Sequence, residues 1–355
     1  MRNFPLTIIA GSTARKRLAS EGWQPELFTA MVGASGGAKL LGLGHLDRYL
    51  FGQYLSRSNH PMELYGSSIG SWRHAALASI NPGEAIATLQ DRYMNQQWAE
   101  DDPRSPAEVV DGLCEWVLDS LLTPDDVNHI ATNPRFRTHI ITALGLGINS
   151  HQRKSMVALG MGKAAMFNAI NRQLLEHSFQ RVVFSSGISE SFVFKDFNTR
   201  HVDISAENLR SALLASGSIP LLMSGQRDIT GAPTGHYWDG GIIDYHFDFK
   251  NCTGDGLVLY PHFSDQIVPG WFDKSISRRR INTHQLDNLV LVAPSASYIK
   301  SLPYGKIPDR RDFQKMSQAA RLAYWRECVS ASQALADAFI EVIESPDPLR
   351  FIEGR

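Results

Sequence analysis

The stretch LFTAMVGASGGAKLLGLGHLDRYL spans residues 27–50 and combines three kinds of local structure. Leu27 to Val32 is a short apolar run that contains residues favoured in strands, which predicts a buried strand. Glycines dominate the turn at 33–39, and the spacing of the leucines that follow, up to Leu50, predicts a helix. A buried strand that leads through a glycine-rich turn into a helix is typical of the α/β class.

The same order recurs in MELYGSSIGSWRHAALA, residues 62–78, with a strand over Met62 to Tyr65, a tight turn, and a helix that begins near Trp72. Further strands are predicted at 139–143, 182–185, 192–195, 256–260 and 289–292, and helices at 96–133, 154–179 and 309–344. Because helices alternate with strands, we expect helices on the two faces of one mostly parallel sheet.

The composition excludes several classes of protein. The chain has 355 residues with 35 basic and 36 acidic side chains, so its net charge of −1 provides no field that would gather nucleic acid. A content of 43% hydrophobic residues argues against disorder and is enough for a packed core. The N-terminal sequence does not read as a signal peptide, and no run approaches the roughly 18 apolar residues of a membrane span. We therefore expect a cytoplasmic protein, with secretion lacking a cleaved signal left open.

The cysteines indicate neither crosslinks nor a metal. Cys114, Cys252 and Cys328 lie far apart in the chain, so they predict no disulfide framework and no cysteine-based zinc site. A reducing compartment fits this usage best. We expect no metal and no cofactor.

Two segments match the pattern G-x-S-x-G. This pattern places a serine on a sharp turn between strand and helix, where only glycine fits two residues before and after it, and it exposes the hydroxyl beside the helix N-terminus. Gly66–Gly70 centres on Ser68, and Gly33–Gly37 centres on Ser35. Both segments follow a predicted strand and open a predicted helix, so the local pattern does not choose between the two serines.

The glycine content distinguishes the two serines. Around Ser35 the glycines leave backbone N–H groups uncovered, which suits a loop that donates hydrogen bonds to an anion at a helix N-terminus. Ser68 instead lies in a compact turn followed by the bulky Ile69. We therefore predict Ser68 as the nucleophile. The loop at 33–39 is then the predicted oxyanion hole, formed by Gly36, Gly37, Ala38 and Lys39.

A third motif, Asp239–Gly240–Gly241, follows the aromatic residues Tyr237 and Trp238. An aspartate at the end of an aromatic strand and before two glycines is a carboxylate on a turn that another element can approach closely. The same residues are also compatible with a simple reversal of the chain.

A nucleophilic serine needs a base, and histidine is the usual one. Of the 12 histidines, His246, His262 and His284 follow the acidic segment and would keep the order Ser, Asp, His of an α/β-hydrolase. His74 is six residues beyond Ser68 on the same predicted helix and is expected to point away from the turn. A serine esterase with a Ser-Asp-His triad is therefore one alternative.

The three motifs together, namely the glycine loop ending at Lys39, the turn around Ser68 and Asp239–Gly241, resemble those of the patatin-like phospholipases. Leu214–Pro220 (LASGSIP) is similar to the segment that precedes the aspartate motif in that family, and Asp244 falls where the family often has Asn or Asp. The resemblance covers about residues 28–250. It implies a three-layer α/β fold, with helices on both faces of a central mostly parallel sheet, and the activity of a lipid acyl hydrolase with a Ser-Asp dyad and no catalytic histidine.

The resemblance also implies a mechanism. Asp239 accepts the proton of Ser68, Ser68 attacks an ester carbonyl to form an acyl-enzyme, and the N–H groups of Gly36 and Gly37 hold the oxyanion. An aspartate with its usual pKa of about 3.9 is a weak base toward a hydroxyl, so the site is expected to be poorly solvated. The glycines expected to support the two motifs are Gly66, Gly70, Gly240 and Gly241.

The loop departs from the family pattern G-G-G-x-R/K-G at two positions. Ser35 replaces the first glycine, which bears on the number of oxyanion donors, and Leu40 replaces the last, which bears on packing; Lys39 keeps the cation. The loop also comes close to the nucleotide-binding pattern G-x-x-x-x-G-K-[ST], but Ala38 and Leu40 break it, so ATP binding is disfavoured. A catalytically idle member that binds lipid or acts as a scaffold is a further alternative.

Because the motifs are far apart, we expect a single domain over 1–355, with a catalytic core at 28–250. Helical excursions are expected near 96–133 and 154–179, and strands and helices at 251–355 complete the fold. The expected substrate is a phospholipid or another acyl ester. Aromatic and basic residues between 267 and 280, among them Trp271 and Arg278, suggest a peripheral contact with a membrane near these residues.

Overall fold

The computed structural model describes residues 4–99, 101–252 and 254–354. Its centre is a sheet, which in the described residues has ten strands. In chain order these are β1 (Leu6–Ala10), β2 (Phe28–Gly33), β3 (Met62–Ser67), β4 (Phe136–Gly145), β5 (Phe179–Ser185), β6 (Thr199–Asp203), β7 (Gln226–Arg227), β8 (His236–Asp239), β9 (Leu257–Pro261) and β10 (Leu289–Pro294).

The strand order is β1-β10-β9-β2-β3-β4-β5-β6, and β8 pairs with both β4 and β7. The central run β10-β9-β2-β3-β4 is parallel, whereas β1 joins β10, and β5 and β8 join β4, in the antiparallel sense. Every residue of β3, β9 and β10 is buried, as expected for strands covered on both faces. The mostly parallel central sheet predicted from the sequence is confirmed.

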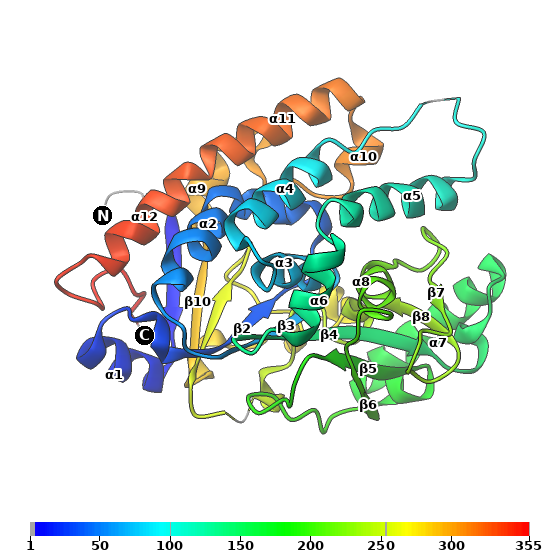
Figure 1. Ribbon diagram of the computed structural model, residues 1–355, viewed down its shortest axis with the longest axis horizontal. Helices are drawn as coiled ribbons and strands as arrows, with labels where there is room; N and C mark the ends of the chain where they lie inside the picture. The colour runs from blue at the N-terminus through cyan, green and yellow to red at the C-terminus, as the bar shows by residue number, and fades with distance from the viewer. Residues whose placement is uncertain (1–3, 100, 253, 355) are drawn as a thin grey trace.

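The helices of the described residues are α1 (Ser12–Glu21), α2 (Gly44–Tyr49), α3 (Ile69–Leu77), α4 (Pro82–Met94), α5 (Pro106–Asp119), α6 (Pro124–Thr132), α7 (Lys154–Ile170), α8 (Leu209–Gly217), α9 (Ala296–Ser301), α10 (Asp312–Lys315), α11 (Gln318–Ala331) and α12 (Gln333–Ile343). The helices α2, α3, α4, α11 and α12 pack against one face of the sheet, and α11 and α12 run along the top of Figure 1. The two termini lie at the same end of the molecule (Figure 1), where Ile8 of β1 bridges to Ile352.

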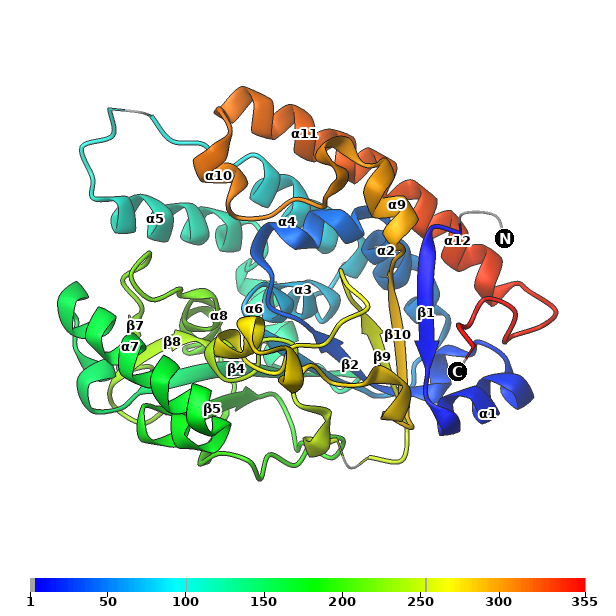
Figure 2. The same ribbon diagram turned by 180° about the vertical axis from the view of Figure 1, so that it is seen from behind.

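The other face of the sheet is covered mainly by connecting segments. Met31 and Val32 are consecutive in β2 and pack into different clusters, because successive strand residues point to opposite faces. Val32 packs with Phe192, Phe247 and Ile267, which belong to the connections rather than to helices. Figure 2 shows the gold segment between β9 and β10 crossing in front of the strands. Together with α7, these segments form the third layer of an α/β fold.

Several predicted elements differ in detail. The strand predicted at 192–195 does not form, and Phe192 makes only an isolated bridge with Cys252, because a neighbouring strand does not extend along this segment. The helix predicted over 154–179 ends at Ile170, because Asn171 has an extended backbone and its side chain accepts a hydrogen bond that begins a short 3-10 helix. At the excursion near 96–133, the first helix begins only at Pro106, where Ser105 and Glu108 form a capping box.

The strands β1 and β6 lie at the two edges of the sheet and are absent from the sequence prediction. Leu6–Ala10 is too short and too apolar to show the alternation that marks a half-buried strand, and β6 (TRHVD) is mostly polar. Edge strands of this kind are specified by the neighbour that they pair with. Within the described residues, no helix combines the length and the apolar composition that crossing a bilayer requires.

Candidate active site

The turn between β3 and α3 holds Ser68 in an unusual backbone conformation, with φ of 54° and ψ of −130°. Such a conformation is strained for a residue with a side chain and is typical of a nucleophile turn. The flanking glycines are required by close contacts. A Cβ on Gly70 would lie 2.0 Å from the carbonyl oxygen of Gly33, and one on Gly66 would lie 2.5 Å from Cα of Ser71. The steric reason for the G-x-S-x-G spacing therefore applies here.

The hydroxyl of Ser68 donates a hydrogen bond of 2.7 Å to Oδ2 of Asp239, across 171 positions of the chain. Both residues are buried, with 8% and 5% of their surface exposed. The backbone N–H of Ser68 donates to the hydroxyl of Ser216 at 2.9 Å, and that hydroxyl donates to the carbonyl oxygen of Ile141 in β4. Ser216 thus connects the turn to the sheet. The sequence reasoning gave it no role, although it lies within LASGSIP.

Asp239 is the last residue of β8, and the turn after it holds its carboxylate. Oδ1 accepts a hydrogen bond of 2.7 Å from the N–H of Gly241, and the N–H of Asp239 donates to the carbonyl oxygen of Ser218. Both glycines are needed for close approach: a Cβ on Gly240 would lie 2.2 Å from the Ile141 carbonyl oxygen, and one on Gly241 would lie 2.5 Å from the Ser35 hydroxyl. Asp239 is therefore oriented by two donors, the hydroxyl of Ser68 and the N–H of Gly241.

Burial raises the pKa of Asp239 to about 6, because desolvation disfavours the charged carboxylate. The hydrogen bonds from Ser68 and Gly241 oppose this shift, as do the more distant charges of Lys274 and Arg310. The result is a carboxylate that is ionised at pH 7 and is a stronger base than a solvated aspartate. This is the poorly solvated site that the mechanism requires.

The glycine loop lies between β2 and the 3-10 helix η2 (Gly37–Leu43). The first backbone hydrogen bond of this helix is from the N–H of Lys39 to the carbonyl oxygen of Gly36, at 3.3 Å. The N–H groups of Gly37 and Ala38 precede that bond and therefore have no acceptor within the helix. Gly37 has φ of +56°, a conformation that other residues rarely adopt. The loop is thus able to present backbone donors.

Ser35 lies beside Gly241 of the aspartate turn, but among the described residues its hydroxyl bonds to neither Ser68 nor Asp239. Its hydroxyl lies 3.0 Å from the hydroxyl of Ser67, and only 2% of its surface is exposed. Its backbone N–H donates to the carbonyl oxygen of Tyr245, so this donor is already engaged within the protein. Leu40, the second departure, is buried in the core on the helical face of the sheet.

The histidines do not join the dyad in the part of the chain that the structure describes, where no histidine nitrogen lies within hydrogen-bond distance of Ser68 or Asp239. His246 and His262 are buried against each other, with ring centroids 4.3 Å apart, and burial lowers the pKa of both. His74 is buried beneath Gly33. His284 belongs to the 3-10 helix at Thr283–Gln285, and its side chain lies outside the described residues.

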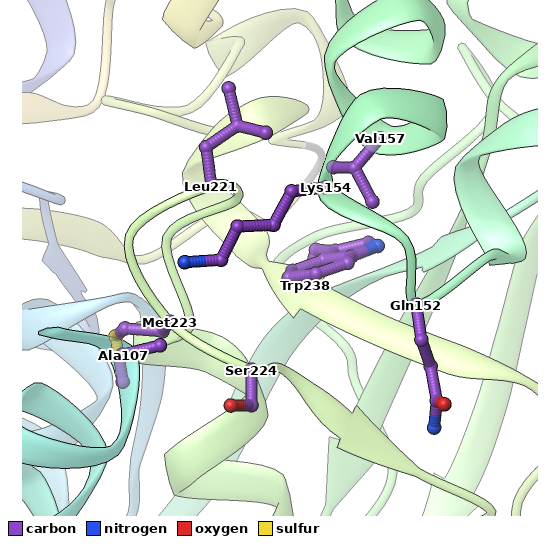
Figure 3. Close-up of a pocket in the computed structure, with 8 residues that line it drawn as sticks. All are labelled: Ala107, Gln152, Lys154, Val157, Leu221, Met223, Ser224 and Trp238. Atoms are coloured by element: carbon purple, nitrogen blue, oxygen red, sulfur yellow. The ribbon is translucent and has the colours of Figure 1, made fainter. Parts of the chain in front are cut away.

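Among residues 4–99, 101–252 and 254–354, no group of three or more His, Cys, Asp or Glu side chains is placed to hold a metal ion. A cavity of about 300 Å³ lies beside β8 and is lined by Trp238, Val157 and Met223 among others. Figure 3 shows the Lys154 side chain reaching across it between Leu221 and Met223. Neither dyad residue lines this cavity, because Trp238 and Asp239 are consecutive strand residues and point to opposite faces.

Asp244 forms part of a buried ion network that supports the aspartate motif. Nε and Nη2 of Arg181 donate to the two oxygens of Asp244 at 2.7 and 2.9 Å, and Nη1 of Arg181 bonds Asp196 at 2.8 Å. Arg181 and Asp244 have no exposed surface. Because Arg181 is in β5 and Asp244 follows β8, these bonds hold the segment after β8 against β5. Removing one partner would leave the other buried and uncompensated.

The segment at 267–280 is more ordered than the sequence suggested. Trp271 is half-buried and stacks on Phe272. Arg279 forms an ion pair of 2.7 Å with the buried Asp273, so it serves the local structure. Arg278 is exposed and donates to the carbonyl oxygen of Ala169 near the end of α7. A contact with a membrane at this segment stays a prediction.

Comparison with known protein families matches the part of the chain that contains the motifs. The family model of the patatin-like phospholipases matches residues 31–246, which include the glycine loop, Ser68 and Asp239. No curated protein matches the chain. The matched range covers more than half of the chain. The fold described above, a mostly parallel sheet covered on both faces, is the three-layer fold that the resemblance implied. The chain therefore belongs to the patatin-like phospholipase family.

Proposed function

We propose that the protein is a lipid acyl hydrolase, a phospholipase of the A type or a carboxylesterase, that cleaves acyl esters through Ser68 and Asp239. The observation that carries the proposal is the hydrogen bond of 2.7 Å from the Ser68 hydroxyl to the Asp239 carboxylate, formed by a serine on a strained turn. A nucleophile bonded directly to a base is the arrangement that acyl transfer needs.

The proposed reaction has two halves. As the hydroxyl oxygen of Ser68 attacks the ester carbonyl, Oδ2 of Asp239 takes the proton, and the N–H groups of Gly36 and Gly37 stabilise the oxyanion. Collapse of the tetrahedral intermediate breaks the bond to the alcohol, which leaves with the proton from Asp239. In the second half, Asp239 takes a proton from water, whose oxygen attacks the acyl carbonyl; the bond from the acyl carbon to Oγ of Ser68 then breaks, the acid leaves, and Asp239 returns the proton to Oγ. Ala38 and Lys39 complete the loop that shapes the oxyanion hole.

The pH dependence of hydrolysis tests the assigned base. Asp239 accepts a proton only when ionised, so we expect kcat/KM on a neutral 4-nitrophenyl ester to fall about tenfold per pH unit below the pKa of about 6 and to level off above it. Protein fluorescence over the same range serves as the control for unfolding. A profile that is flat from pH 5 to pH 8 would contradict Asp239 as the base.

The predicted contact with a lipid surface near Trp271 and Arg278 belongs to the same proposal. It is supported by the neighbouring helix α7, which exposes the apolar side chains of Leu159, Met166 and Ile170 to 63%, 58% and 69%. Arg278 reaches the end of this helix through its bond to the Ala169 carbonyl oxygen. An apolar helical face beside basic residues is typical of a surface that meets anionic lipid.

Sedimentation with anionic vesicles checks this contact. Arg278→Gln combined with Arg280→Gln removes two exposed cations, each worth roughly 1 kcal/mol near an anionic surface, so we expect binding to fall by an order of magnitude or more. Arg279 is left intact because of its ion pair with Asp273. Binding that equals the wild-type value would rule out this surface.

A further inference from the structure

Three cations from separate parts of the chain gather around the aromatic residues beside the glycine loop. Lys39 belongs to η2, Lys274 to η9 (Trp271–Ser275), and Arg310 to the segment before α10. Nζ of Lys274 lies 3.7 Å from the centroid of the Tyr245 ring and 5.4 Å from that of Trp271. The guanidinium carbon of Arg310 is also 5.4 Å from the Trp271 centroid, so Trp271 connects the two cations.

Lys39 is joined to the same cluster by a second set of rings. Its Nζ lies 4.2 Å from the centroid of Phe263. The His246 ring lies between Phe263 and Tyr245, with centroids 5.2 Å from the first and 4.3 Å from the second. The three cations therefore follow one continuous aromatic platform. We call Lys39, Lys274 and Arg310 the cation cluster.

The platform is part of the wall of the proposed active site. The carbonyl oxygen of Tyr245 accepts the N–H of Ser35 at 2.9 Å, next to the proposed oxyanion donors. Phe263 packs so closely on Gly36 that a Cβ there would lie 2.7 Å from the ring. Lys274 and Arg310 are also among the charges that act on the pKa of Asp239, so their field reaches the dyad. The cluster thus borders the glycine loop through Phe263 and Tyr245 and acts electrostatically on Asp239.

The cation cluster has no counter-ion in the described part of the chain, where none of its three members forms an ion pair. Asp309 acts on the charge of Lys39, but its carboxylate is already engaged by Arg311 at 2.9 Å and by Lys306 at 3.4 Å. Arg181 differs from these three cations, because its charge is paired with the carboxylates of Asp196 and Asp244. Part of each side chain of Lys274 and Arg310 is open to solvent, so an incoming anion can reach them.

The cluster members also repel one another. Partial desolvation of the ammonium group, together with the charges of Arg310 and Lys39, lowers the pKa of Lys274 to about 7, although the charge of Asp239 opposes this shift. Three mutually repelling cations held close together are unfavourable unless an anion compensates them, and charged groups with shifted pKa values cluster at functional sites. Phosphate is an anion that lysine and arginine bind through charge-assisted hydrogen bonds, and it is the charged group that an acyl ester of a phospholipid carries.

We propose that the cation cluster is an anion subsite, which selects acyl esters that carry a phosphate group close to the scissile bond over uncharged esters of the same acyl chain. This inference rests on the proposed function, because it concerns the substrate of the same Ser68. Lys39 lies within the range 31–246 that matches the family, whereas Lys274 and Arg310 lie outside it, so two of the three cations come from this chain's C-terminal part.

The test compares two matched pairs of esters at one pH. The soluble pair is 1-butyrylglycerol 3-phosphate and 1-butyrylglycerol, and the lipid pair is 1-oleoylglycerol 3-phosphate and 1-oleoylglycerol in the same non-ionic micelles. For wild type we expect kcat/KM to favour the phosphorylated ester by about tenfold or more, mainly through KM, because charge-assisted bonds form on binding. Lys274→Gln with Arg310→Gln should bring the ratio of the two kcat/KM values close to one.

Lys300→Gln with Arg200→Gln is the matched control, since it makes the same change of charge at two exposed positions on α9 and β6 and should keep the wild-type ratio. A preference in both pairs assigns the subsite to the phosphate itself, and a preference in the lipid pair alone assigns it to a lipid headgroup. Ser68-dependent cleavage with a ratio near one in both pairs overturns the subsite. Cleavage of both esters by Ser68→Ala instead contradicts the proposed function.

Discussion

Ser68→Ala is expected to abolish ester hydrolysis, with a loss of kcat on the order of 10⁴-fold to 10⁶-fold, as for other serine hydrolases that lose their nucleophile. The reason is chemical, because no acyl-enzyme can form without the hydroxyl that donates to Asp239. Hydrolysis of a 4-nitrophenyl ester measures the loss. Labelling by a fluorophosphonate probe gives a second readout, which wild type should show and Ser68→Ala should lack.

Ser35→Ala is the matched control, because Ser35 centres the other G-x-S-x-G segment. Its hydroxyl bonds to Ser67 and to neither Ser68 nor Asp239, so this variant should keep most of the wild-type kcat and all of the labelling. An inactive Ser35→Ala enzyme beside an active Ser68→Ala enzyme would reverse the assignment. Failure of the wild-type protein to label would favour the idle, lipid-binding alternative.

Asp239→Asn is expected to lower kcat on the order of 10⁴-fold without unfolding the protein, because the amide has no basic oxygen to accept the serine proton. The same substitution is expected to leave the stability of the protein at pH 7 unchanged or to raise it. Burial raises the pKa of Asp239 to about 6, above the value of an unfolded aspartate, so the folded state binds this proton more tightly. The resulting stabilisation is full below pH 4 and is lost as the pH rises through about 6. At pH 7 the buried charge is a cost that asparagine removes, and Tm should equal or exceed that of wild type.

Asp244→Asn provides the contrast at a neighbouring turn. Its carboxylate pairs with the fully buried Arg181, so its loss leaves a guanidinium with a weakened partner, and we expect Tm to fall. Thermal unfolding of the two variants at pH 7 measures both effects, together with residual hydrolysis. An Asp239→Asn enzyme that keeps wild-type kcat, or that is less stable than Asp244→Asn, would contradict the separate roles given to the two carboxylates.

The parts of the fold predicted well are those whose signal lies within a few consecutive residues. The strands β2, β3, β9 and β10 are apolar runs bounded by turns, and their positions follow from burial alone. The segment at 192–195 has the same local appearance but forms no strand. Whether such a run pairs with a neighbour depends on the rest of the chain, which is also why β1 and β6 were missed.

The residues of the candidate site also fall into those with a local sequence signal and those without one. The turn around Ser68 could be read from its glycines, because Gly66 and Gly70 meet a steric need within five residues. Ser216, which holds the N–H of Ser68, had only the weak signal of lying in LASGSIP. Lys274 and Arg310 had no local signal at all, since each is an ordinary surface cation until Trp271 and Tyr245 bring it to the glycine loop.

By itself, the sequence determined the α/β class and the two candidate serines. The prediction of Ser68 with Asp239 came from the resemblance to the family, and the residues alone left a histidine triad open. Only the tertiary structure decided that the Ser68 hydroxyl meets Asp239 directly, at 2.7 Å across 171 positions, and that the Ser35 hydroxyl bonds to Ser67 instead. The physical reason is one of range. Backbone steric limits act between neighbouring residues, so they can be recognised from the spacing of glycines. Other properties arise only when the strands pair and exclude water: the distance between two side chains, the desolvation of Asp239 and the gathering of three cations.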